Sequence, residues 1–304
     1  MTLVKRKIDL AFQLGTGSFG EDGSDTVDIT GLRTSVQITE TGGVQMAELQ
    51  LRVWGMPLDT MQKLTVLNKL AYEQERNNTV IVKAGDDQTG TAVVFAGTIK
   101  EAWADASNAP DVEFIVSAFS GLLAAVKPVA PTSFKGPVDA DVFFASLARQ
   151  ITEGGQPTPY GLENSGVTGV LDSPYYPGTA LEQIRAGARA LNCNAVLDSV
   201  KRVLAIWPAG KARGEQVVDL SPETGLVGYP QFTQNGIALT TLYTPSLTFG
   251  QAIKVKSALG AANGTWTVAA VQHSLDAEIP GGQWFTRVEC GLLGQTAPVI
   301  GTPS

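Results

Sequence analysis

The sequence predicts a mainly β fold with a small α/β insert, in which two related β-domains flank the insert. Three observations predict it. Glycine and proline are frequent, at 33 and 16 of 304 residues, and this composition favours strands joined by turns. Apolar and polar residues alternate in the first and last thirds of the chain, which is typical of half-buried strands. A long hairpin in each of these thirds resembles the other.

The first third reads as strands around one short helix. The turn Glu40–Gly43 separates two strands, and a phase slip between Met46 and Leu49 predicts a β-bulge. Leucine and methionine at helical spacing predict a short helix after Pro57. Strands resume near Val80 and continue into a long hairpin. The alternating apolar positions are Val27, Ile29, Val36, Ile38, Leu49, Leu51, Val53, Val112, Phe114 and Val116.

The middle of the chain changes character at PVAPTSFKGPVD, a Pro-rich stretch that predicts a domain boundary. Residues 139–151 read as a helix with Asp139 or Asp141 as its N-cap. After a Gly/Pro/Ser loop, Thr179 and Glu182 form the capping box of a second helix. Residues 194–207 then read as a hairpin. This segment is a predicted α/β domain.

The last third is predicted to be strands again. It contains an Asn235-Gly236 turn signal, alternation through Ile253 and Val255, and a second long hairpin. That hairpin begins at Thr267 and the first one at Thr98, and each ends in Gly-Leu-Leu. The similarity predicts two copies of one β-domain. The expected domains are residues 1–127, 128–212 and 213–304, the last with a short C-terminal tail.

Charge and cysteine content exclude several classes. The formal net charge is −7 and the pI is about 4.9, with basic residues scattered apart from Lys5–Lys7. Nucleic-acid binding needs a concentrated basic face, so DNA is not expected as a direct ligand. Cys193 and Cys290 form no C-x-x-C pair, and two reduced thiols are expected, with a disulfide as the alternative. We find neither a signal-peptide core nor a spanning apolar run, so no membrane anchor is expected.

The stretch LGTGSFG, Leu14–Gly20, matches the phosphate-binding pattern G-x-G-x-x-G. A dinucleotide site would require a helix opening at Gly20, but the following residues read as a turn and a strand. A kinase would require H-R-D and D-F-G segments, and neither is present. We therefore interpret Leu14–Gly20 as a loop between strands, and we expect no cofactor.

No catalytic or metal-binding set is predicted. His273 is the sole histidine, whereas a catalytic triad needs an oriented base and a zinc site needs several ligands. The acidic pairs Glu21-Asp22 and Asp86-Asp87 lie in glycine-bounded turns, where solvated side chains are expected. The interface candidates are the aromatic residues of the β-domains and the histidine: Trp54, Trp103, Trp266, His273 and Trp284.

Three long stretches carry a resemblance to a known family. The segment LGTGSFGEDGSDTVDITGLRTSVQ and its continuation to Thr65 resembles the opening domain of baseplate hub proteins of contractile-tailed bacteriophages. The segments GLVGYPQFTQNGIALTTLY (from Gly225) and NGTWTVAAVQHSLD (from Asn263) are similar to the closing domain. The middle segment TALEQIRAGARALNCNAVLD resembles the α/β insert of this family.

The resemblance implies a fold and a role. It implies that the β-domains are tube-like β-barrels and that three chains form a homotrimer with six such domains. The trimer would be a structural hub that joins the hexameric tail tube to the trimeric central spike, contacts other baseplate proteins and leaves a channel for DNA. It would be a virion component, assembled in the host cytoplasm, and not an enzyme.

The sequence leaves two alternatives open. One is the equivalent hub of a contractile bacteriocin or a secretion-type injection machine, which would have the same fold. The other is an enzyme, either one that binds nucleotide at Gly15–Gly20 or one that degrades the cell wall.

Overall fold

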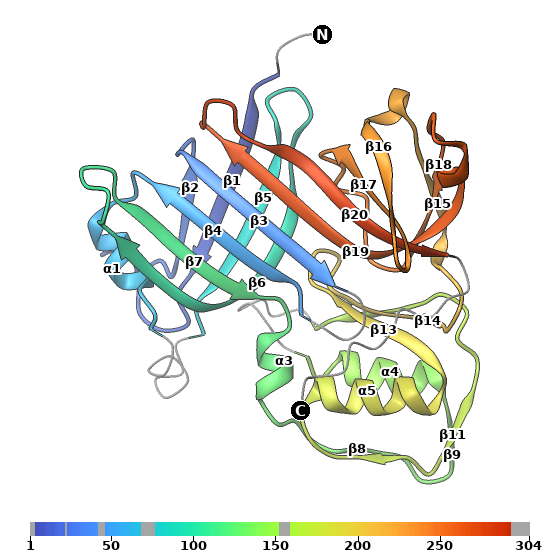
Figure 1. Cartoon of the computed structure of the whole chain (residues 1–304). Coiled ribbons are helices and arrows are strands. Elements are labelled where there is room, and N and C mark those ends of the chain that lie inside the picture. Colours follow the sequence, from blue (N-terminus) through green and yellow to red (C-terminus); the bar gives the residue numbers. More distant parts are fainter. Residues whose placement is uncertain (1–3, 22, 42–45, 68–76, 152–158, 293–304) are drawn as a thin grey trace.

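The computed structural model of the chain describes all residues except 1–3, 22, 42–45, 68–76, 152–158 and 293–304. Strands dominate it, as the sequence predicts. Two β-units lie side by side and share one 13-stranded sheet, and a small α/β unit lies beneath their junction (Figure 1).

The first β-unit is antiparallel throughout. Its strand order is β3-β4-β7-β6-β5-β1-β2. The elements are β1 (Arg6–Gln13), β2 (Thr26–Thr30), β3 (Thr34–Thr41), β4 (Glu48–Trp54), α1 (Leu58–Leu64), β5 (Thr79–Asp86), β6 (Gly90–Asp105) and β7 (Glu113–Phe119). The predicted strands, hairpin and short helix are thus confirmed. The bulge predicted between Met46 and Leu49 is wrong: β4 begins at Glu48, and Glu48 and Leu49 pair in regular register with both β3 and β7.

The strand β6 lets this sheet fold back on itself. Its first half pairs with β5 and its second half with β7, and a register shift between Ile99 and Glu101 marks a β-bulge between the halves. The sheet therefore curves around one apolar core. That core includes Phe12, Leu49, Phe95 and Phe114, none more than 1% exposed.

The insert is an α/β unit with its own core around Phe143, Phe144 and Ile184. A chain segment with β8 (Thr132–Ser133) and β9 (Pro137–Asp139) leads into α4 (Ala140–Ala148), and α5 (Ala180–Ala190) follows later. The predicted capping box of Thr179 and Glu182 is present at α5. Asp139 occupies the N-cap of α4, but its side chain makes no capping hydrogen bond.

The Gly/Pro/Ser loop predicted before Gly178 contains short strands that the sequence did not reveal: β10 (Gly161–Asn164), β11 (Val170–Asp172) and β12 (Tyr175–Tyr176). The predicted hairpin is β13 (Cys193–Asp198) and β14 (Val203–Pro208). β10 pairs with β14 in parallel, which completes a three-stranded sheet.

The second β-unit has the strand order β15-β18-β19-β20-β17-β16. Its core includes Ile237, Val268, Val271 and Val288. The elements are β15 (Arg213–Leu220), β16 (Leu226–Thr233), β17 (Gly236–Leu242), β18 (Gln251–Val255), β19 (Gly264–Ala277) and β20 (Trp284–Leu292).

The two β-units are copies of one topology. The order β1-β5-β6-β7-β4-β3 matches β15-β18-β19-β20-β17-β16 strand for strand, both in space and along the chain. One difference is that β1 and β5 are antiparallel, whereas β15 and β18 are parallel. The second unit also lacks a strand equivalent to β2 among the residues that the structure describes.

A shared bulge fixes the alignment of the copies. β6 shifts register after Ile99, and β19 shifts register after Val268, each one residue beyond the threonines that the sequence comparison aligned. Thr98 pairs with Phe119 and Thr267 with Gly291, so these pairs correspond. The two Gly-Leu-Leu segments do not correspond, because Gly121 follows β7 whereas Gly291 lies within β20.

An antiparallel pairing of β3 with the second half of β19 joins the two copies, and we call it the internal seam. It runs from Ala270 opposite Thr41 to Ala277 opposite Thr34. Leu275 and Ala277 belong to the core of the first unit. The boundaries at 127 and 212 remain predictions. A separate main core in each unit is consistent with them. The seam, however, carries one late segment into the first core, and a small fourth cluster packs Trp207 of the insert against Phe249 of the second β-unit.

Candidate functional site

One face of the shared sheet is covered by no core, and we call it the polar face. It consists of the residues that alternate with the core positions on β3, β4, β6, β7, β19 and β20, and apart from Thr98 none of these is fully buried. Its uncharged polar members include Gln37, Gln50 and Gln272. Its charged members are Glu48, Glu101, Asp105, Glu113, Asp276, Glu289, Arg52, Lys100 and Arg287, so acidic residues outnumber basic ones.

Two strand edges correspond to the internal seam but do not form it. β16 is the second copy's equivalent of β3, and within the described part of the chain it ends the sheet with no strand beyond it. The second half of β6 is the first copy's equivalent of the part of β19 that pairs with β3. On this edge Ala102 exchanges both backbone hydrogen bonds with Val66, while Ala104 is exposed.

Exposed apolar side chains accompany the β16 edge. Tyr229 and Phe232 are 67% and 59% exposed, and Val227 is 40% exposed. Pro230 interrupts the edge, since proline has no N–H to offer a neighbouring strand. The part of β16 that can accept another strand is therefore Gln231–Thr233.

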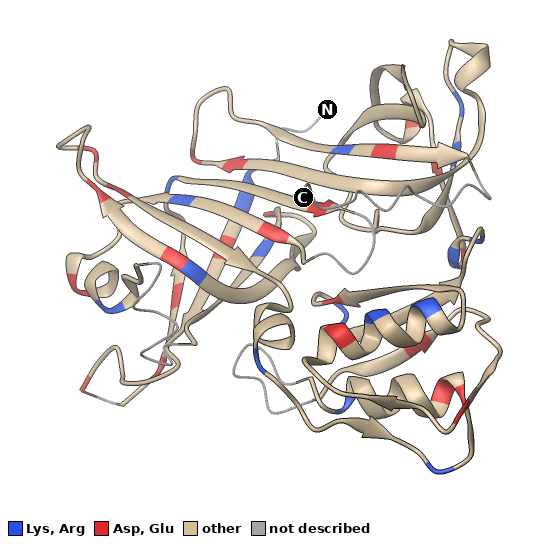
Figure 2. Cartoon of the chain, turned by 60° about the horizontal axis from the view of Figure 1, so that its bottom comes forward, with Lys and Arg blue, Asp and Glu red and all other residues tan. Residues whose placement is uncertain are grey.

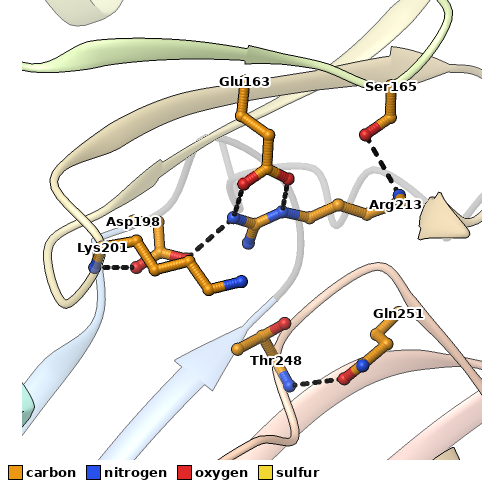
Figure 3. A network of polar contacts seen from close by, with 8 residues as sticks. Glu163, Ser165, Asp198, Lys201, Arg213, Thr248 and Gln251 are labelled. Atoms are coloured by element: carbon orange, nitrogen blue, oxygen red, sulfur yellow. Dashed lines mark hydrogen bonds and ion pairs between the residues drawn. The ribbon is translucent and has the colours of Figure 1, made fainter. Parts of the chain in front are cut away.

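A buried polar junction forms where the three units meet (Figure 3). The Arg213 guanidinium on β15 donates Nε–H and Nη2–H bonds to the Glu163 carboxylate at 2.7 and 2.9 Å, and Nη2–H also bonds Asp198 at 2.8 Å. The Arg213 side chain is 4% exposed. A bidentate pair holds both partners in a fixed orientation. The contact therefore ties the second β-unit to β10 and β13 of the insert.

Glu40 brings the first β-unit into the same junction. It lies near the end of β3, and the backbone of Phe249 favours the charged form of its carboxylate. Burial raises the pKa of Glu40 to about 7, with a further contribution from the negative charge of Asp198. Arg213 opposes this shift but already serves two carboxylates, so Glu40 shares the junction with an excess of negative charge.

The five predicted interface residues divide by position. Trp54 and Trp103 lie on the polar face and are half-buried, and Arg33 stacks on Trp54 with its guanidinium carbon 4.5 Å from the ring centroid. Trp284 is half-buried on the core side, against Tyr243. Trp266 and His273 are 8% and 5% exposed.

Both buried residues have partners within the chain. The Trp266 indole donates to the carbonyl of Ala262, and Nδ1 of His273 lies 2.9 Å from the Thr286 hydroxyl. Burial lowers the pKa of His273 to about 4, so its ring is neutral at physiological pH. An interface role for the five residues stays a prediction, and the three half-buried tryptophans retain surface for it.

Leu14–Gly20 forms a loop between β1 and β2, as the sequence predicted, and no helix follows it. Its backbone is held within the chain: Gly15 N–H donates to Asn78 Oδ1, and Lys63 Nζ donates to the Phe19 carbonyl. A Cβ at Gly15 would lie 2.7 Å from the backbone nitrogen of Asn77. The glycine at this position thus permits a close backbone approach.

Other chemistry is sparse in the described part of the chain. Cys193 and Cys290 are free, and burial raises the pKa of their thiols to about 11 and about 12. Across the described residues, no three His, Cys, Asp or Glu side chains cluster as metal ligands would. None of the described helices has the length and apolar character that crossing a membrane requires.

Solved structures with this fold are tail proteins and related assemblies. A tail protein from Neisseria meningitidis MC58 matches with a TM-score of 0.58 at 9% identity, covering 93% of this chain and 96% of that one. The 43 kDa tail protein of prophage MuSo2 from Shewanella oneidensis gives 0.57 at 10% identity, with the same coverages. The c3393 protein of E. coli, a type VI secretion component, gives 0.55 at 10% identity, covering 90% of this chain and 77% of that one.

These likenesses define the fold as that of phage tail proteins. The curated proteins contain no match to the chain. Residues 9–289 match the family described as Baseplate hub gp41. The chain belongs to this baseplate hub family, and it is therefore a structural protein of the phage tail.

Sequence reasoning missed the polar junction. Glu163 lies in the segment that reads as a loop, and Asp198 and Arg213 are ordinary charged residues in sequence. The sequence contains one weak signal: Arg213 stands at the start of a strand, and the first apolar residues of that strand, Val217 and Val218, come only four residues later. A basic residue therefore takes the place at which a strand next to a core would carry an apolar one. The free edges of β16 and β6 could be found only after the strand order was known.

Proposed function

We propose that three copies of this chain form a ring of six β-units that joins the hexameric tail tube to the trimeric central spike of a contractile phage tail. The duplicated topology is the observation that supports it. A trimer of a duplicated unit presents six similar units, so it can match a sixfold partner on one side and a threefold partner on the other.

The internal seam shows how neighbouring units can join. Within one chain, β3 of the first copy pairs with β19 of the second, so eight strands run in the order β16-β17-β20-β19-β3-β4-β7-β6. Closing such a sheet through three chains would remove its exposed edges, which otherwise invite aggregation. The ring proposal thus gives a role to both strand edges.

In this ring the polar face lines the channel through which DNA passes. The cores occupy the opposite face of the same strands, so the polar face is the one left for an aqueous lumen. Figure 2 shows acidic residues in red and basic residues in blue along the strands of the sheet. The acidic excess of the polar face would repel the phosphate backbone and keep DNA from adhering.

The remaining roles follow from the same proposal. The chain would contact the tail tube, the spike and other baseplate proteins, and it would assemble in the host cytoplasm before joining the virion. It would act without catalysis. Family membership and the three-unit fold support this assignment.

The mass of the protein in solution, measured by light scattering across concentration, tests the ring. We expect three chains per particle, alone or together with the tube and spike proteins. An image of the assembled tail should place the ring between the tube and the spike. A chain that stays monomeric with every tail component, or that lies elsewhere in the particle, contradicts the proposal.

A further inference from the structure

We infer that neighbouring copies of the chain join by antiparallel pairing of Gln231–Thr233 on β16 with Trp103–Asp105 on β6, in the register that the internal seam already shows. This inference rests on the proposed ring and specifies its interface. The partner is a second copy of the same chain, and the argument comes from the correspondence between the two β-units.

The correspondence fixes which residues would meet. Glu101 and Ala270 are the first paired residues after the bulge in β6 and β19. Ala104 and His273 each lie three residues beyond them, so these two residues are equivalent. The hairpin pairings make Phe232 equivalent to Ile38, because Thr233 opposite Gly236 corresponds to Thr39 opposite Glu48. Ile38 pairs with His273 in the internal seam, so Phe232 would pair with Ala104.

The backbone groups on both edges suit this pairing. In the seam, Ile38 and His273 point their N–H and C=O groups at each other. On β6, Ala102 bonds outward to Val66, and Ala104, two residues on, points the same way. Among the described residues, no hydrogen bond occupies the outward backbone groups of Ala104 or Phe232.

Burial gives a second, independent argument. Ile38 is fully buried at its position in the seam, whereas the equivalent Phe232 is 59% exposed. Ala104 is exposed where its equivalent His273 is buried. The exposed Phe232 ring and the small Ala104 side chain lie on two unpaired strand edges, and pairing of these edges between two chains would bury both side chains. Transfer of the Phe232 ring from water would favour association.

The contact is short for identifiable reasons. Pro230 prevents regular pairing before Gln231. At the other end, Val66 occupies the position equivalent to Glu40 of the seam, which leaves Ala104 as the next open residue on β6. The interface should therefore be weaker than the eight-residue seam, and it should depend strongly on Phe232.

Disulfide trapping tests the register. Gln231 and Asp105 would form a non-hydrogen-bonded pair, where Cα atoms lie about 4.5 Å apart and a disulfide can form. We expect the Gln231→Cys, Asp105→Cys double variant to give covalent dimers and trimers under oxidising conditions. Gln37→Cys with Ser274→Cys, the equivalent pair within the seam, should give an intrachain disulfide and serves as the geometric reference.

The outcomes separate the two claims. All cysteine variants are made with Cys193 and Cys290 replaced by serine, since both native thiols are free. Gln231→Cys with Glu101→Cys then places the added cysteines out of register, and a variant with one added cysteine lacks the matching position, so these should give no trimer band. If light scattering finds three chains but the Gln231–Asp105 pair does not cross-link, the register is wrong and the ring stands. If the chain remains monomeric at every concentration, both the ring and the proposed pairing of β16 with β6 are wrong. Phe232→Asp should shift the protein to monomer while leaving its circular dichroism unchanged.

Discussion

Arg213 joins the second β-unit to the insert through hydrogen bonds to two carboxylates, those of Glu163 and Asp198. Arg213→Ala would leave the carboxylate of Asp198, whose side chain is 8% exposed, without its cation. Removing one partner of a buried pair costs about 3–5 kcal/mol, because the other charge stays buried and unpaired. We expect a loss of this order in the free energy of unfolding, measured by urea denaturation.

The control is an exposed ion pair. Lys5→Ala removes the contact between Lys5 and Glu278, whose side chains are 63% and 38% exposed. Solvent already screens this pair, so stability should hardly change. If both variants lose equal stability, the buried Arg213 contacts contribute no more to the free energy of unfolding than an exposed ion pair does.

Glu40 predicts a pH dependence. Its pKa is raised from 4.5 to about 7, so the folded chain binds a proton here that the unfolded chain releases. Stability from this group should therefore be full below about pH 4.5 and fall as the pH rises to about 7. The loss is at most about 3 kcal/mol.

The Glu40→Gln variant isolates this effect. The free energy of unfolding, measured from pH 4.5 to pH 8, should fall in the wild type relative to the variant. His273 opposes the slope, since its lowered pKa makes the protein lose stability as the pH falls from 6.5 towards 4. The difference between wild type and variant removes the His273 contribution. A difference that does not change with pH would mean that Glu40 is ionised throughout.

Among elements, the two helices of the insert are in unusually close contact. Gly187 of α5 is buried against the ring of Phe143 on α4, and a Cβ there would overlap the ring. Gly187→Ala forces α4 and α5 apart and should cost about 1–3 kcal/mol. Thermal unfolding should show the loss. Gly260→Ala is the matched control, because a Cβ there meets no atom within 4 Å.

Local signals predicted elements well and long-range pairings poorly. The capping box at Thr179, the Asn235-Gly236 turn and the two long hairpins each depend on neighbouring residues, and the structure confirms all of them. The strand β10 was missed because four residues among glycines and prolines carry no periodicity. Its parallel partner β14 lies far along the chain, and only the tertiary fold brings them together.

The polar junction was missed for a related reason. Glu163, Asp198 and Arg213 come from three separate strands, and each looks like a surface charge in isolation. The sequence did reveal the duplication, but only weakly. Strand order and the shared bulge established it, since these persist where residue identities have diverged.

For the whole molecule, the polar face leads to a prediction about DNA. Replacing Glu48, Glu101 and Glu289 by lysine would reverse the charge of the proposed channel. We expect this variant to bind duplex DNA with an affinity that falls steeply with salt, because lysines release counterions from the phosphates. The wild type should not bind. Fluorescence anisotropy across salt concentration measures both.

A matched triple variant tests whether location matters. Lysine at Asp139, Asp172 and Glu215 changes the net charge equally, but none of these residues lies on the polar face. It should bind DNA more weakly than the channel variant. Equal affinity and equal salt dependence would show that the polar face holds no special position relative to DNA.

The internal seam also determines when the first β-unit can finish folding during translation. β3 is synthesised early, yet its partner on β19 follows more than two hundred residues later. Throughout that interval on the ribosome, the first unit has an open strand and lacks Leu275 and Ala277 from its core. The first β-unit can therefore complete its sheet and core only after β19 has left the ribosome. Fragments from interrupted translation would expose the unpaired β3 edge and would tend to aggregate. Production of the protein thus favours fast, uninterrupted synthesis, or a chaperone that covers this strand edge until β19 has been made.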